Sequence, residues 1–66
     1  MQMPITVARS AWECAWVLWT DYRDRLAESQ RQRMLLFTFR DEEHITAEEG
    51  GEIFALYGEI TGERRV

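Results

Sequence analysis

Residues 10–30, SAWECAWVLWTDYRDRLAESQ, are the stretch that decides the predicted fold. They open with a capping box, in which the Ser10 hydroxyl accepts from the Glu13 amide and the Glu13 carboxylate accepts from the Ser10 amide. No Gly or Pro follows before Gln30. At about 100° per residue the apolar side chains cover an arc of about 160°. The pattern predicts one helix over residues 11–30 with a broad buried face.

The apolar face of this predicted helix carries Trp12, Trp16 and Trp19 at helical spacing. Their size makes them the expected core of a small domain. The alternative is that one of them stays exposed as an anchor for a partner protein. The acids of the first half of the chain fall within about 80° of one another on the opposite face of the same helical wheel: Glu13, Asp21, Asp24 and Glu28.

Two short segments have strand character. Residues 4–7 begin with Pro4 and continue with the β-branched Ile5, Thr6 and Val7, which is typical of an edge strand. Residues 34–40, MLLFTFR, pass from an apolar run into alternation of Phe37 and Phe39 with polar neighbours. We expect a strand at each place. A helix over residues 34–40 is the alternative, because no helix breaker precedes them.

A second capping box, Thr46 with Glu49, predicts a helix over residues 47–61. Apolar residues at helical spacing follow it, and Gly62 ends it. Gly50 and Gly51 weaken this prediction, since each glycine inside a helix costs roughly 0.5–1 kcal/mol relative to alanine. A helix that begins at residue 52, or a strand over residues 52–57, is the alternative. The predicted fold is therefore α+β in a single small domain, residues 1–66, with an all-α small bundle as the alternative.

Charge is distributed unevenly along the chain. Residues 1–40 contain six Arg against four acids, whereas residues 41–66 contain two Arg against eight acids. If residues 47–63 are helical, Glu48, Glu52 and Glu59 share one face with Glu63 in a row of roughly 22 Å. The net charge of −4 would repel nucleic acids and anionic membranes, so a basic protein is the expected partner. A solvated face that keeps the protein soluble is the simpler interpretation.

Catalytic and cofactor chemistry have little support in the sequence. Cys14 has no second cysteine for a disulfide, and neighbouring acids would raise the pKa of its thiol, so we expect a partly buried inert thiol. His44 is the single histidine, and it has no second nitrogen or sulfur ligand with which to hold a metal. We therefore expect no enzyme, no cofactor and no metal site. The single cysteine and the lack of a signal-like or spanning apolar segment favour a cytoplasmic protein.

In size, acidity, single-domain organisation and Arg-only basic composition the chain resembles the small acidic inhibitors of phages and mobile elements, anti-CRISPR proteins in particular. The resemblance implies a bacterial host and a protein that blocks a nucleic-acid-binding partner, such as a CRISPR surveillance complex, by electrostatic mimicry of DNA. The alternative is an antitoxin-like or subunit-like interaction module, a monomer or weak homodimer, that binds through an exposed Trp or through Phe37 and Phe39. The acids predicted to contact the partner are Asp24, Glu28, Asp41, Glu42, Glu43, Glu48, Glu52, Glu59 and Glu63.

Overall fold

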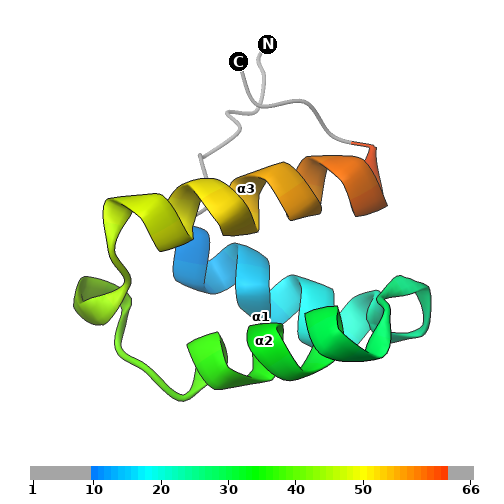
Figure 1. Ribbon diagram of the computed structural model, residues 1–66, viewed down its shortest axis with the longest axis horizontal. Helices are drawn as coiled ribbons and strands as arrows, with labels where there is room; N and C mark the ends of the chain where they lie inside the picture. The colour runs from blue at the N-terminus through cyan, green and yellow to red at the C-terminus, as the bar shows by residue number, and fades with distance from the viewer. Residues whose placement is uncertain (1–9, 63–66) are drawn as a thin grey trace, which may run out of the picture.

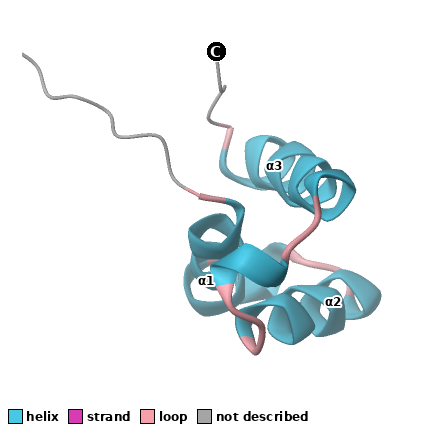
Figure 2. Ribbon diagram, turned by 90° about the vertical axis from the view of Figure 1, so that its left-hand side faces the viewer, coloured by secondary structure: helices cyan, strands magenta, loops and turns pink. Residues whose placement is uncertain are grey.

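The computed structural model describes residues 10–62, which form three α-helices. Helices α1 (Ala11–Asp21), α2 (Glu28–Thr38) and α3 (Ala47–Thr61) are joined by two short 3-10 helices, η1 (Arg23–Arg25) and η2 (Glu42–His44). Helices α1 and α3 run in roughly the same direction and α2 runs against both (Figure 1). Seen nearly end-on, the three helices occupy the corners of a triangle (Figure 2). Residues 10–62 contain no strand, so the α+β prediction is wrong and the all-α alternative matches the structure.

The helix predicted over residues 11–30 is in fact two helices. Its capping box is present, with the Ser10 hydroxyl 3.1 Å from the Glu13 amide nitrogen, but α1 ends at Asp21. The chain then turns through η1, and Leu26 becomes part of the core. The guanidinium of Arg31 donates to the carbonyl of Leu26 at 3.3 Å and so ties the turn to α2. A continuous helix would have carried the apolar residues of α2 away from α1, and their burial against α1 outweighs the local helix preference.

Helix α2 begins without a side-chain cap from Ala27, but Gln30 supplies half of a capping box. The Gln30 side-chain oxygen accepts from the Ala27 amide at 2.8 Å. This bond satisfies one of the amide groups that every helix leaves unpaired at its start. The sequence signature of a capping box also requires a Ser or Thr at the cap, so Gln30 alone does not mark the start of this helix.

The strand predicted over residues 34–40 is also wrong, because α2 covers most of this segment. A strand would place Phe37 and Phe39 on the same face. In the structure Phe37 is 1% exposed and Phe39, the residue after the helix, is 77% exposed. Met34 and Phe37, three residues apart, share the buried side of α2. The strand predicted over residues 4–7 lies outside the described residues.

Helix α3 confirms the prediction for residues 47–61. The Thr46 hydroxyl accepts from the Glu49 amide at 3.1 Å, and the Glu49 carboxylate accepts from the Thr46 amide at the same distance. Gly50 is buried, and a Cβ placed on it would lie 3.5 Å from the Cβ of Ala11, so this glycine sits where α3 crosses the start of α1. Gly62 follows the helix with a φ of 80°, the left-handed conformation that glycine adopts most easily.

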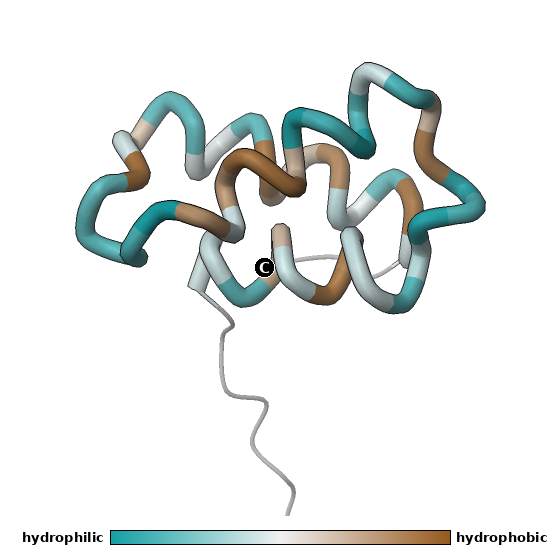
Figure 3. The backbone as a smooth tube through the Cα atoms, turned by 90° about the horizontal axis from the view of Figure 1, so that it is seen from below, coloured by the Kyte–Doolittle hydropathy of each residue, from teal (hydrophilic) through white to brown (hydrophobic). Residues whose placement is uncertain are grey.

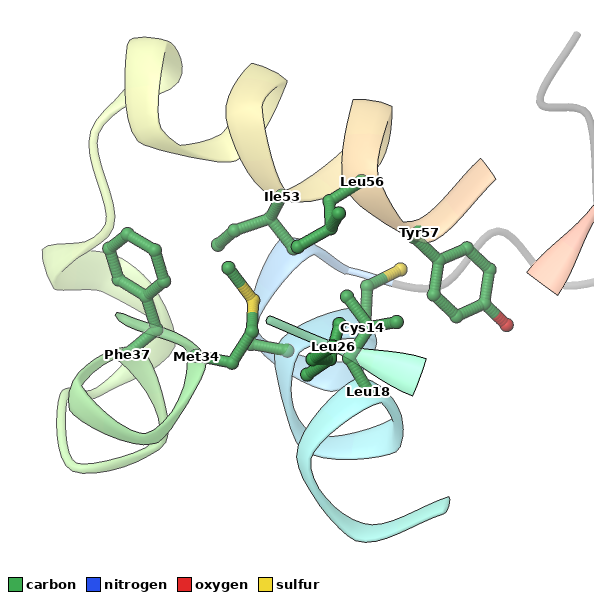
Figure 4. Packing of buried hydrophobic residues seen from close by; sticks show 9 residues of the cluster. Cys14, Leu18, Leu26, Met34, Phe37, Ile53, Leu56 and Tyr57 are labelled. Atoms are coloured by element: carbon green, nitrogen blue, oxygen red, sulfur yellow. The ribbon is translucent and has the colours of Figure 1, made fainter. Parts of the chain in front are cut away.

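The core lies between the three helices (Figure 4). Both α2 and α3 pack against α1, which they share. The core consists of buried apolar side chains from every helix and from the turn after η1: Cys14, Ala15, Leu18, Leu26, Met34, Phe37, Ile53, Leu56 and Tyr57. Cys14, expected to be partly buried, is completely buried.

The tryptophans border this core instead of filling it. Trp19 packs against it, Trp12 is partly buried, and Trp16 is 40% exposed. Trp12 and Trp16 meet edge to face, with ring centroids 6.1 Å apart. The Trp12 indole nitrogen is buried without an acceptor among the described residues. The expectation of a tryptophan core was therefore wrong for Trp16, which is exposed; its role as an anchor for a partner stays a prediction.

Candidate functional site

The acidic row predicted on α3 exists, but part of it is paired. Glu48, Glu52 and Glu59 are exposed on one side of α3. The Arg33 guanidinium on α2 binds the Glu52 carboxylate through two nitrogens, Nε and Nη2, the second at 2.8 Å. These hydrogen bonds lower the pKa of the Glu52 carboxyl and raise that of Arg33. The fourth predicted member of the row, Glu63, lies outside the described residues.

A second ion pair joins the end of α2 to the start of α3. Arg40 Nη1 donates to Glu49 Oε1 at 2.6 Å, which lowers the pKa of the Glu49 carboxyl. The guanidinium groups of Arg33 and Arg40 also lie over the Phe37 ring, 5.0 and 5.3 Å from its centroid. Both arginines are thus held by a carboxylate and an aromatic ring. Within residues 10–62 neither arginine forms an ion pair with a second acid.

The carboxylates of the α2–α3 connection remain open to a partner. Asp41, Glu42 and Glu43 are exposed, and so is Glu48 at the start of α3. Within residues 10–62 the one ion pair of this group is between Asp41 and His44, with 3.6 Å between Oδ2 and Nδ1, and it requires a protonated imidazole. No cluster of His, Cys, Asp or Glu in the same range is arranged to hold a metal ion.

Asp24 and Glu28 lie at the other end of the bundle. The single acidic face that we expected from Glu13, Asp21, Asp24 and Glu28 does not form, because the helix ends at Asp21. Asp24 belongs to η1 and Glu28 is the first residue of α2. The η1 turn and the η2 connection lie at opposite ends of the molecule (Figure 1), and hydrophilic residues dominate both (Figure 3).

The charge asymmetry of the sequence persists in three dimensions. Residues 10–40 contain five Arg and four acids, whereas residues 41–62 contain seven acids and no Arg. Two of the seven are paired with arginines: Glu52 with Arg33 of α2, and Glu49 with Arg40, which follows α2. The other five carry their charge without an Arg partner among the described residues.

Sequence reasoning named Phe37 and Phe39 as possible contacts, but Phe37 is buried, and the apolar surface on the solvent side of α2 to which Phe39 belongs was not predicted. We call this surface the outer face of α2 and define it by Gln32, Leu35, Leu36 and Phe39. Leu36 is 58% exposed and Phe39 is 77% exposed, while Leu35 is partly covered. The signal was present in MLLFTF, which holds more apolar residues than one side of a single helix can bury.

The outer face of α2 lies close to the acidic row of α3. Around the axis of α2, Arg33 is about 60° from Leu36, and Arg33 is the residue that binds Glu52. The exposed leucine therefore borders the edge along which α3 presents Glu48, Glu52 and Glu59. Apolar side chains and carboxylates meet on one side of the molecule, a combination that suits contact with another protein.

Comparisons with known proteins add no assignment: no protein-family model, curated protein or solved structure matches this chain. Among residues 10–62, no helix has the length and apolar character needed to cross a membrane.

Proposed function

We propose that this chain acts by binding a basic protein and covering the surface with which that protein binds nucleic acid. The observation that carries the proposal is that Leu36 and Phe39 are exposed near the carboxylates of the α2–α3 connection, none of which has an Arg partner within residues 10–62. Apolar contacts would provide affinity, and the carboxylates would select a surface rich in Lys and Arg. A subunit of a CRISPR surveillance complex in the cytoplasm of a bacterial host is a partner of this kind.

Pure mimicry of a phosphate row is a weaker version of the proposal. Glu52, in the middle of the α3 row, is bound by Arg33 and is not free to replace a phosphate. The carboxylates that remain without an Arg partner within residues 10–62 lie on both sides of it: Asp41, Glu42, Glu43, Glu48 and Glu59. The chain would thus resemble a nucleic-acid strand with evenly spaced phosphates less closely than a protein ligand whose contact surface has an acidic rim.

The test begins with capture of partners from lysates of bacteria that carry CRISPR systems, with the full chain as bait. A captured protein is then purified, and its affinity for the chain is measured from low to high salt, because exposed ion pairs are screened within about 10 Å at 0.1 M ionic strength. We expect affinity to fall as salt rises, and nucleic acid to compete with the chain for the partner. A captured protein that binds the chain and its nucleic acid at once would contradict the proposal.

A charge-neutralised variant makes this test specific. It replaces Glu42, Glu43, Glu48 and Glu59 by Gln and leaves both arginine-bound carboxylates intact. We expect weaker binding and a smaller dependence on salt. Unchanged affinity in this variant would show that the carboxylates serve solubility alone.

A second candidate function is an antitoxin-like or subunit-like interaction module that associates through aromatic surface. The exposure of Phe39 and of Trp16 favours it. Such association would be insensitive to salt, since apolar burial is screened little by ions. The salt series therefore separates the two functions.

A further inference from the structure

Helix α2 is apolar on two opposite sides. Met34 and Phe37 are buried in the core, whereas Leu36 and Phe39 are exposed to solvent. At about 100° per residue, the centre of the outer face of α2 lies about 180° around the helix from the centre of the buried side. Exposed large apolar side chains that lie together mark a surface for contact with another protein.

The two ends of α2 carry different charges. Residues 21–31, around the start of the helix, contain three acids and three arginines, so their net charge is zero. The end where α2 finishes is acidic, because Asp41 and the two residues after it carry carboxylates that have no Arg partner within residues 10–62. The arginines of the first end likewise have no carboxylate partner in this range: Arg23, Arg25 and Arg31.

The structure holds two of these arginines at the start of α2. Arg31 lies about 40° from Leu35 around the helix axis. Its guanidinium donates to the carbonyls of Arg23 and Leu26 at 3.4 and 3.3 Å. The Arg23 guanidinium lies over the Trp19 ring, 4.9 Å from its centroid. Positive charge is therefore fixed beside one end of the outer face of α2.

This surface is complementary to itself about a twofold axis through its middle. In an antiparallel pair of α2 helices, the exposed region around Leu36 would meet the same region of a second copy, as twofold interfaces require. The acidic α2–α3 connection of each copy would then lie beside the arginines of the other. In a parallel pair the two acidic connections would lie together, which opposes association.

We propose that the outer face of α2 pairs with that of a second copy of the chain in an antiparallel, twofold-symmetric dimer. Leu36 and Phe39 form its apolar centre, and Arg25 of each copy faces the acidic connection of the other. This inference goes beyond the proposed function. Because both contacts use the same apolar side chains, the second copy and the partner protein compete, and the dimer is a form in which the partner-binding surface is covered.

The dimer is expected to be weak. The outer face of α2 extends from Gln32 to Phe39, about 11 Å along the helix. A contact centred on two helical turns falls at or below the roughly 1,000 Å² of a lasting interface. The net charge of −4 on each copy adds some repulsion. We therefore expect a dissociation constant on the order of 0.1–1 mM.

The first experiment measures self-association of the full chain. Sedimentation equilibrium gives the mass, and NMR of the nitrogen-15-labelled chain gives the amide shifts, from dilute solution up to about 1 mM. We expect the mass to rise toward that of a dimer and the concentration-dependent shifts to gather around Leu36 and Phe39. A chain that stays monomeric at the highest concentration, or shifts centred on α1 or α3, would overturn the inference.

A spin label tests the antiparallel orientation. It is attached to a cysteine in Ser29→Cys, at the exposed start of α2, since the native Cys14 is completely buried and does not react. The labelled chain is mixed with nitrogen-15-labelled chain that has no spin label. We expect broadening of the amides around Phe39 and the α2–α3 connection. Broadening around residue 29 instead would show a parallel pair and refute the arrangement.

Variants then test the apolar centre. The double substitution Leu36→Ser and Phe39→Ser should weaken self-association about tenfold or more, whereas Trp16→Ser, which removes an exposed apolar side chain from α1, should change it by no more than about twofold. Circular dichroism verifies that the helices are retained, and the shifts of the unaltered chain decide the question if a variant unfolds. Unchanged association in the folded double variant, or its loss in Trp16→Ser alone, would refute the assignment.

A pair of charge variants tests the complementary ends. Arg25→Glu with Ser29→Glu makes the start of α2 acidic, and Glu42→Arg with Glu43→Arg makes the connection basic; all four positions are exposed. Each double variant alone should self-associate about three- to tenfold more weakly, and an equimolar mixture of the two should recover the dimer. Equal association of the separate and mixed variants would show that the ends do not meet.

Failure of this inference can be told apart from failure of the proposed function. If the chain remains monomeric while a captured partner binds in a salt-dependent way, the dimer is wrong and the proposed function stands. If the dimer forms but a captured partner binds regardless of salt and of the charge-neutralised variant, the proposed function is wrong and the dimer stands.

Discussion

Gly51 offers a direct test of whether α3 starts at Ala47. This residue lies in the second turn of α3, it is exposed, and a Cβ placed on it would meet nothing within 4 Å. Replacement by alanine therefore adds no clash. Its main effect is to reduce the backbone entropy that glycine loses on folding.

The expected gain in the free energy of unfolding follows from the difference in helix propensity between alanine and glycine. Alanine is favoured over glycine inside a helix by roughly 0.5–1 kcal/mol. For a domain of this size 1 kcal/mol shifts the melting temperature by about 4–8 °C, so Gly51→Ala should raise it by about 2–8 °C. Thermal unfolding followed by circular dichroism at 222 nm, the far-ultraviolet signal of helix, measures this shift.

Two other glycines serve as controls. Gly50→Ala places its new methyl group 3.5 Å from the Ala11 Cβ, an ordinary contact, and should also stabilise. Gly62→Ala should lower the free energy of unfolding by about 1 kcal/mol. Gly62 has a φ of 80°, and this left-handed backbone conformation is unfavourable for an L-residue that has a Cβ. A melting temperature that is unchanged or lower in Gly51→Ala would show that α3 begins later than Ala47, and the reasoning would fail.

Three further predictions concern the side chains of α2 and its ion pairs. In chemical denaturation, Phe37→Ala should lower the free energy of unfolding by about 3–5 kcal/mol, whereas Phe39→Ala should change it by no more than about 0.5 kcal/mol. Equal losses of stability in the two variants would contradict the placement of Phe37 in the core and Phe39 in solvent. A double-mutant cycle of Arg33→Ala and Glu52→Ala should give a coupling of about 0.2–1 kcal/mol that shrinks with salt, and a zero coupling would mean the pair does not form in solution. The pKa values of Glu49 and Glu52 are lowered in the folded state, so their stabilisation is present above the ordinary value of 4.5 and is lost as pH falls below it; urea unfolding at about pH 5 and about pH 3 should show this loss, and replacing both residues by Gln should reduce it.

The parts of the fold that could be predicted from the sequence are those with complete local signals. Both capping boxes, at Ser10 and at Thr46, begin helices at the expected residues. Within α3 the apolar spacing was sufficient despite two adjacent glycines. Local hydrogen bonds and periodicity depend on neighbours in the chain, so the sequence contains them directly.

The break between α1 and α2 could not be predicted in the same way. No Gly or Pro marks it, and the local preference of residues 22–27 is compatible with a helix. The turn forms because the core needs Leu26, Met34 and Phe37 against α1, and this is a long-range requirement. One error led to the next: once the first helix was extended to residue 30, its acids were placed on one face that does not exist.

The candidate site was partly predictable for a related reason. The acidic character of residues 41–62 is visible in the sequence, and so is the row on α3. Which carboxylates are neutralised depends on Arg33 and Arg40, which lie 19 and 9 residues before their partners. Those pairings exist only once α2 has folded back beside α3.

The position of the three tryptophans gives the molecule a selective optical signal. All three indoles belong to α1, and Trp12 and Trp16 stand edge to face at 6.1 Å. Their emission therefore reports on the packing around α1, the helix against which both α2 and α3 pack. A ligand seated on the outer face of α2 would leave this signal almost unchanged, whereas unfolding would shift it strongly. Intrinsic fluorescence can thus distinguish a variant that has lost its partner from one that has lost its fold, with no added dye.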